Sequence, residues 1–189
     1  MMSRRALVTC TLIALIAIGY FLGGEVRFVK ESSLATSTPT ALDPKEWYPV
    51  VRVVDGDTII VSIEGKGVRV RLIGLDTPES VDPRVPVECF GHEASDQMKR
   101  ILTTQYVRVQ EDPSQGRFDK YGRLLAYIYA PLDSTQEGLL MNEYMIREGY
   151  GHEYTYNLPY KYQATFRAAE REAREQKKGL WAADACKDF

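Results

Sequence analysis

Three short polar segments of the chain carry side chains suited to phosphate and metal chemistry. The segments 55–58 and 76–79 are acidic turns, Arg71 precedes the second of them, and Arg123 ends the segment 119–123. Calcium prefers carboxylate and carbonyl oxygens, and the planar donor fork of an arginine suits a phosphate group. A spare carboxylate at Glu79 would act on water as a general base. Together these side chains predict metal-assisted hydrolysis of a phosphodiester.

Each segment also has an ordinary interpretation when it is taken alone. An Asp-Gly pair such as Asp55-Gly56 usually makes only a turn, and an arginine on a barrel face is usually solvated or paired with a carboxylate. What favours a catalytic site is the joint occurrence of two acidic turns and two arginines in this order.

Alternating apolar and polar residues predict the elements that position these side chains. Five β-rich runs are separated by turn residues: Trp47–Val54, Thr58–Ile63, Val68–Ile73, Tyr106–Gln110 and Leu124–Ala130. In the third run, Arg69 and Arg71 share one face and the apolar residues share the other.

Helical spacing of apolar residues predicts three helices after the third strand. They cover Gly91–Leu102, then Leu139–Glu148, which ends at Gly149, and a last helix that begins near Pro159. Five short strands with one helix after the third and two at the end are typical of an α+β, five-stranded OB-fold β-barrel with helical additions.

The N-terminal part of the chain has a different composition. Arg4 and Arg5 precede an uncharged run from Ala6 to Gly24, which is long enough to cross a bilayer core of roughly 30 Å. We therefore expect a signal-anchor or transmembrane segment over 1–24, a flexible linker over 25–44 and the folded domain over 45–189. The domain would lie outside the cytoplasm, either anchored in the membrane or secreted after cleavage of the N-terminal segment.

Two of the three cysteines fall within the folded domain. An exported protein meets an oxidising compartment, where Cys89 and Cys186 would form a disulfide that ties the C-terminus to the body of the domain. The alternative is two unpaired thiols, since two cysteines alone carry no CxxC or metal-ligand pattern.

The formal net charge of −2 excludes a basic nucleic-acid coat protein. If the chain handles nucleic acid, its positive charge must therefore be local rather than spread over the surface.

The ordered motifs resemble those of the staphylococcal nuclease (thermonuclease) family. The segments that carry the resemblance are Val53–Thr58, Arg71–Glu79, Phe90–Ser95 and Asp119–Arg123. The match covers roughly Tyr48 to Trp181. It implies an OB-fold barrel of five strands with three helices, and a Ca²⁺-dependent nuclease that acts on DNA and RNA.

The resemblance also implies a metal site and a general base. Asp57 and Asp76 would bind Ca²⁺ through their side chains, and Thr77 would bind it through its backbone carbonyl. Glu79 would activate the attacking water.

The resemblance implies substrate contacts as well. Arg71 and Arg123 would grip the scissile phosphate, and Lys120, Tyr121 and Tyr154 would contact the terminal phosphate and the nucleotide. The products would be 3′-phosphorylated fragments. Stacking on Tyr154 favours single strands without sequence preference.

A binding module is the alternative from a different functional class. OB-fold barrels commonly hold nucleic acid without cutting it. Such a module at the cell surface would lack an arginine, the general base or a calcium carboxylate, whereas this chain has all of them. We expect a monomer.

Overall fold

The structure is a computed structural model that describes residues 42–80, 83–84, 86–131, 138–156 and 158–187. The predicted N-terminal anchor over 1–24 and the linker up to residue 41 lie outside the described residues. Within the described ranges, no helix is both long and apolar enough to span a bilayer.

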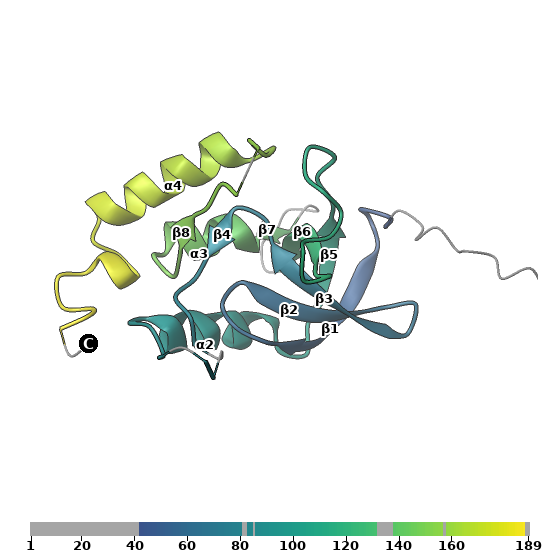
Figure 1. Ribbon diagram of the computed structural model, residues 1–189, viewed down its shortest axis with the longest axis horizontal. Helices are drawn as coiled ribbons and strands as arrows, with labels where there is room; N and C mark the ends of the chain where they lie inside the picture. Colours follow the sequence, from purple (N-terminus) through teal and green to yellow (C-terminus); the bar gives the residue numbers. More distant parts are fainter. Residues whose placement is uncertain (1–41, 81–82, 85, 132–137, 157, 188–189) are drawn as a thin grey trace, which may run out of the picture. The chain divides into compact units, whose positions relative to one another are not determined.

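A closed β-barrel forms the centre of the domain (Figure 1). Its strands are β1 (Trp47–Val53), β2 (Thr58–Ile63), β3 (Lys66–Leu72), β5 (Tyr106–Gln110) and β6 (Leu124–Ala130). Neighbouring strands pair antiparallel in the order β3-β2-β1-β5-β6, and a parallel pairing between β3 and β6 closes the barrel. Together with the three helices of the described residues, this barrel confirms the predicted OB-like architecture.

Alternation along the strands separates the core from the outer surface. Ile59, Val61 and Val70 have no exposed surface, whereas Ile60 and Arg69 point to the other face. Outward-facing positions on β3 and β6 therefore share one side of the barrel wall, because side chains alternate between the two faces of a sheet.

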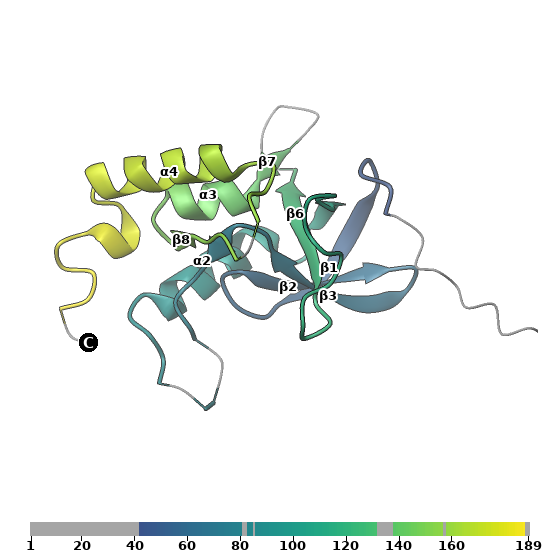
Figure 2. The same ribbon diagram turned by 45° about the horizontal axis from the view of Figure 1, so that its top comes forward.

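The described residues form three helices beside the barrel: α2 (Gly91–Leu102), α3 (Met141–Arg147) and α4 (Gln163–Glu175). Figure 2 shows α3 and α4 side by side, and their residues are in contact. Each long helix buries one apolar stripe, with Ala94 and Met98 in α2 and Phe166 and Ala169 in α4. The burial of these stripes fixes α2 on the barrel at β1 and α4 on α3, which in turn packs on β6.

Two of the predicted helix starts were too early. Leu139 and Leu140 form a short strand, β7 (Leu139–Leu140), because they pair with the end of β6. The segment after Pro159 is held in tertiary contacts before α4 begins: the Lys161 N–H donates to Asp112 Oδ2 at 2.9 Å.

Short elements that periodicity does not reveal hold the chain between β3 and α2. The strands β4 (Leu75–Asp76) and β8 (His152–Glu153) pair antiparallel. Just before β8, a Cβ atom added at Gly151 would lie 2.7 Å from the Asp76 carbonyl oxygen, so only glycine permits this close approach. The buried Asn142 donates to the Ile73 carbonyl at 2.7 Å and so holds the chain after β3 against α3.

A disulfide joins Cys89 to Cys186, with 5.7 Å between their Cα atoms. Near the C-terminus, η1 (Gly179–Trp181) packs on the body of the domain: the Leu180 N–H donates to the Gly149 carbonyl at 2.9 Å. The chain end is therefore tied to the start of α2.

Candidate active site

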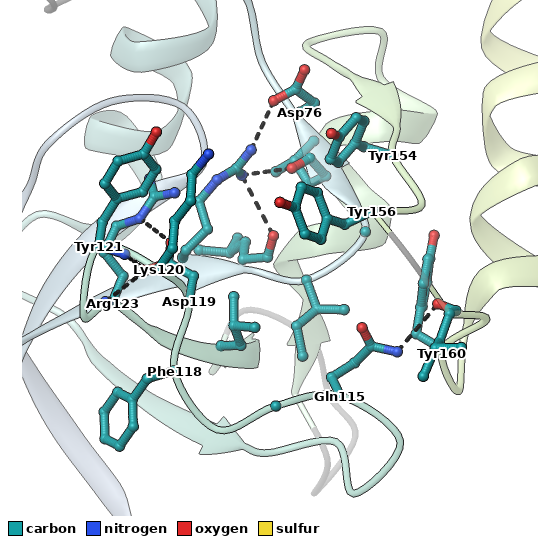
Figure 3. Close-up of a pocket in the computed structure, with 18 of the residues that line it drawn as sticks. Asp76, Gln115, Phe118, Asp119, Lys120, Tyr121, Arg123, Tyr154, Tyr156 and Tyr160 are labelled. Atoms are coloured by element: carbon teal, nitrogen blue, oxygen red, sulfur yellow. Dashed lines mark hydrogen bonds and ion pairs between the residues drawn. The ribbon is translucent and has the colours of Figure 1, made fainter.

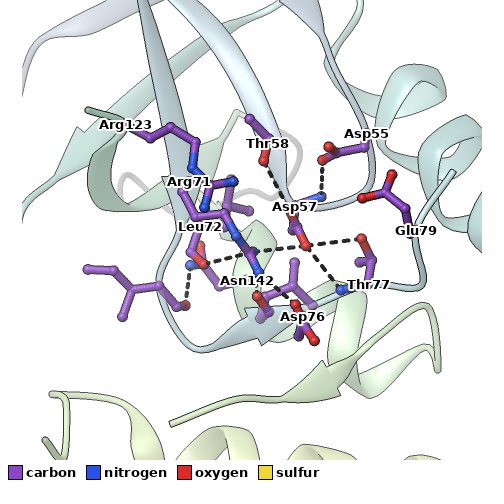
Figure 4. Close-up of polar contacts among 12 residues, drawn as sticks. Asp55, Asp57, Thr58, Arg71, Leu72, Asp76, Thr77, Glu79, Arg123 and Asn142 are labelled. Atoms are coloured by element: carbon purple, nitrogen blue, oxygen red, sulfur yellow. Dashed lines mark hydrogen bonds and ion pairs between the residues drawn. The ribbon is translucent and has the colours of Figure 1, made fainter. Parts of the chain in front are cut away.

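The two acidic turns meet at Asp57 (Figure 4). Asp57 Oδ2 accepts hydrogen bonds from the N–H and the hydroxyl of Thr77, at 3.1 and 3.2 Å, and Oδ1 accepts from the Thr58 hydroxyl at 2.9 Å. Gly56 allows this contact, because a Cβ atom at that position would lie 2.8 Å from the Thr77 side chain. The turn after β1 and the turn after β4 are thus locked together.

Arg71 is the cation of this cluster. Its guanidinium lies 2.9 Å from Asp57 Oδ2 and 2.7 Å from Asp76 Oδ1, and it donates to the Leu75 carbonyl at 2.6 Å. The side chain is only 13% exposed. Arg71 therefore bridges the two carboxylates that the sequence assigned to a metal.

Arg123 lies directly before β6, and its side chain reaches the same cluster. Its Nε donates to Asp119 Oδ2 at 2.6 Å and its backbone N–H to Asp119 Oδ1 at 2.9 Å. Burial raises the pKa of Asp119, but the hydrogen bonds from Arg123 and from the Tyr121 N–H outweigh this effect and hold the pKa below its usual value. The sequence motifs did not assign a role to Asp119. Asp119 precedes Arg123 by four residues in a turn that contains Gly122, and this spacing could have indicated that Asp119 pairs with Arg123.

Glu79 lies at the base of the loop that leads to α2. Its N–H donates to Glu88 Oε2 at 2.9 Å and its carbonyl accepts from the Glu88 N–H at 2.8 Å. A Cβ atom at Gly91 would lie 2.5 Å from the Glu79 carbonyl oxygen, so the first turn of α2 packs directly on this backbone. The helix start and the Glu79–Glu88 pair fix the position of Glu79.

Residues of the two acidic turns, both arginines and Glu79 line one cavity of about 220 Å³. Its lining residues are Asp55, Asp57, Arg71, Asp76, Thr77, Pro78, Glu79 and Arg123. The structure thus brings together every residue predicted for metal binding or catalysis, although they come from four separate segments of the chain.

The donor set fits a hard divalent cation. Four carboxylates, from Asp55, Asp57, Asp76 and Glu79, line this cavity together with Arg71 and Arg123. Burial raises the pKa of Asp76, and the negative charge of Asp57 adds to that effect. The described residues contain no preformed group of three or more His, Cys, Asp or Glu side chains able to hold a metal. A Ca²⁺ site here would therefore need Asp57 and Asp76 together with backbone oxygen from Thr77.

The carboxyl group of Asp55 should make stability depend on pH. Burial, and then the charge of Asp57, raise the pKa of Asp55 to about 7. An unfolded aspartate titrates at about 3.9, so the folded protein keeps a proton that the unfolded chain releases between about pH 4 and 7. This group's contribution to the free energy of unfolding must therefore fall as the pH rises through that interval.

We expect Asp55→Asn, studied in EGTA, to gain stability relative to the wild type as the pH rises from 4 to 7. Urea unfolding of both proteins at several pH values measures this difference. A difference that stays constant with pH would contradict the raised pKa.

A second, larger cavity of about 560 Å³ adjoins the first, and Arg71, Asp76 and Arg123 line both. Figure 3 shows Lys120 and Tyr121 on one side of it and Tyr154 and Tyr156 on the other. Lys120, Tyr121 and Tyr154 are the three predicted nucleotide contacts, and Tyr156 also lines this cavity.

The tyrosines present exposed ring surface to this cavity. Tyr121 is 71% and Tyr154 46% exposed, and the Tyr154 and Tyr156 ring centroids are 6.3 Å apart. The Lys120 ammonium lies 5.0 Å from the Tyr121 ring centroid. Aromatic faces beside a cation suit a base and a phosphate.

Asp112 braces the wall of this second cavity, a role that the sequence did not reveal. Its carboxylate accepts from the Tyr127 hydroxyl at 2.6 Å, the Ser114 N–H at 2.9 Å and the Lys161 N–H at 2.9 Å. Although burial raises it, the pKa of Asp112 is lowered overall by these hydrogen bonds. The loop after β5 is thereby joined to the segment that follows the tyrosines.

Comparisons with known proteins agree with this geometry. The model of the family described as "Staphylococcal nuclease homologue" matches residues 69–183. The chain is 39% identical over 158 residues to the thermonuclease of Staphylococcus hyicus, covering 84% of this chain and 89% of that protein. It is 40% identical over 136 residues to the thermonuclease of Staphylococcus intermedius, covering 72% and 76%. It is 37% identical over 148 residues to the endonuclease YncB of Bacillus subtilis (strain 168), covering 77% and 67%.

Proposed function

Since the chain belongs to the staphylococcal nuclease homologue family, we propose that it is a Ca²⁺-dependent nuclease that hydrolyses phosphodiester bonds of DNA and RNA. The observation that carries this proposal is the convergence of Asp57, Arg71, Asp76, Glu79 and Arg123 on one cavity. A family member that only bound nucleic acid would not need a general base beside two arginines and two metal-binding carboxylates.

The side chains divide the chemistry among them. The guanidinium groups of Arg71 and Arg123 hold the scissile phosphate and stabilise the negative charge that develops on its oxygens. Glu79 accepts a proton from the water that attacks phosphorus. The bond to the 5′-oxygen breaks, which leaves 3′-phosphorylated products.

Asp57 and Asp76 would hold Ca²⁺ through their carboxylates and Thr77 through its carbonyl. When bound, the cation supplies a Lewis acid for the phosphate and lowers the pKa of a bound water. Arg71 now neutralises the two carboxylates, at 2.9 and 2.7 Å. It would exchange these contacts for phosphate oxygens once a divalent cation neutralises Asp57 and Asp76.

The tyrosine-lined cavity would take the nucleotide on one side of the cleaved bond. Lys120 and Tyr121 would contact its terminal phosphate, and Tyr154 would stack on its base. Because stacking needs an unpaired base, single strands are the preferred substrates. We propose that the protein acts as a monomer.

We propose that the domain lies outside the cytoplasm. The segment 1–24 would anchor it in the membrane, or its cleavage would release the domain. The Cys89–Cys186 disulfide supports this location, because disulfides persist in oxidising compartments.

The reaction is tested with the fragment 41–189, which forms one compact unit. We expect it to cleave single-stranded DNA and RNA in Ca²⁺ and to lose this activity in excess EGTA. Glu79→Gln should lower kcat by about 10²- to 10⁴-fold, the usual contribution of a general base. Gel analysis of labelled oligonucleotides measures both effects.

A matched control is Glu64→Gln, because Glu64 is exposed in the turn between β2 and β3. This variant should keep wild-type activity. If the folded wild type binds DNA in Ca²⁺ but does not cleave it, the nuclease hypothesis is wrong and the chain is the surface binding module instead.

A further inference from the structure

A row of arginines crosses the outer wall of the barrel and begins at the candidate active site. The parallel register that pairs Val70 with Leu124 sets Arg69 beside Arg123, one residue earlier on each strand. Ile60 pairs with Arg69 on one side and with Arg52 on the other. The row Arg123–Arg69–Ile60–Arg52 thus runs across β6, β3, β2 and β1.

These side chains lie on the same face of the wall. The neighbours Val70 and Leu124 are buried, which turns Arg69 and Arg123 outward. Arg69 also shares its face with Arg71, two residues further along β3. A bulge between Val50 and Arg52 leaves Arg52 exposed on this face as well.

Arg52 and Arg69 differ from the two arginines of the cavity in their contacts. Arg71 and Arg123 are held by aspartates at 2.6–2.9 Å. Arg52 and Arg69 are exposed, and within the described part of the chain neither makes an ion pair or a side-chain hydrogen bond. Two uncompensated cations beside the cavity, in a protein with a net charge of −2, indicate local recognition of an anion.

We propose that Arg69 and Arg52 bind backbone phosphates of the substrate strand beyond the scissile phosphate, so that the strand continues across β3, β2 and β1. This proposal rests on the nuclease function above. Neighbouring strands lie about 4.8 Å apart, so the row extends about 14 Å from Arg123. Arg69 would take the phosphate next to the cleaved bond and Arg52 a more distant one. The half-buried Ile60 between them offers apolar contact to a sugar or base.

A polynucleotide is favoured over other polyanions because the row is continuous with the cavity. Its first member, Arg123, also lines the cavity that holds Glu79. The contacts would carry no sequence information, because they reach only phosphates.

The test compares Arg69→Gln and Arg52→Gln with the wild type on two single-stranded DNA substrates in Ca²⁺. One is a 16-nucleotide strand, and the other is a dinucleotide whose only internucleotide phosphate is the cleaved one. We expect each variant to lower the ratio of kcat/KM between the long and the short substrate, by several-fold. The slope of log KM against log salt for the long strand should fall by about 0.7 per arginine.

Arg171→Gln is the matched control, since it removes the same charge from an exposed position on α4. It should keep the wild-type ratio and salt slope. Row variants that match Arg171→Gln on both substrates would overturn the phosphate track and leave the nuclease function intact. Failure of the wild type to cleave either substrate would instead overturn the nuclease function and the track with it.

Discussion

Replacing Arg71 with glutamine is expected to lower kcat by about 10²- to 10³-fold, which corresponds to about 3–4 kcal/mol of lost transition-state stabilisation. The guanidinium lies in the cavity with Glu79, where charge would develop on the phosphate oxygens. Glutamine keeps a donor but loses the charge and the planar fork. Initial rates at saturating Ca²⁺ and substrate measure the effect, and Arg123→Gln should behave similarly.

A structural role of Arg71 must be separated from its role in catalysis. Its contacts with Asp57 and Asp76 also neutralise buried charge, so activity must be measured together with stability. Calorimetric titration should show that Ca²⁺ binding is retained, because the competing cation is gone. Arg117→Gln is a suitable control: Arg117 pairs with Glu111 at 3.2 Å and lines neither cavity. An Arg71→Gln protein that is largely unfolded under the assay conditions would assign Arg71 to structure.

Removing the disulfide is expected to produce the largest loss of stability. The bridge closes a loop with a sequence separation of 97 residues between Cys89 and Cys186. The chain-entropy model gives about 4–5 kcal/mol for such a loop. For a domain of this size, that loss lowers Tm by about 10–20 °C. Calorimetry of the oxidised protein and of the Cys89→Ser/Cys186→Ser double variant measures the difference.

The reducing agent provides the matching control. Dithiothreitol should lower the Tm of the wild type towards that of the double variant and leave the double variant unchanged. A change in Tm of less than about 3 °C would show that the bridge hardly constrains the unfolded chain. At temperatures far below both transitions, the double variant should keep most of its activity, because the cavity contains neither cysteine.

The barrel could be predicted from the sequence because its strands follow a period of two. Thr58–Ile63 and Leu124–Ala130 alternate or remain apolar over their whole length, and the structure gives them the predicted bounds. The helix Gly91–Leu102 was equally well defined, by its buried stripe. Local patterns of this kind need no knowledge of distant residues.

The remaining features depend on contacts between distant segments. The two-residue strands β4 and β8 exist only because they pair with each other, and no period can show over two residues. Asp112 and Asn142 are buried polar residues whose partners lie far away in the sequence. Motifs could identify Asp57 and Arg71, but not that Arg71 would bridge Asp57 and Asp76.

The parallel pairing of β3 with β6 makes the candidate active site depend on the folding of the whole domain. Arg71 and Arg123 come close together only when these two strands meet, and α2 and β5 lie between them in the sequence. Contacts between such distant segments carry the entropic cost of closing a long loop, so they form together with the global fold. An unfolded chain therefore lacks the paired arginines, and we expect the proposed nuclease activity to appear only with complete folding.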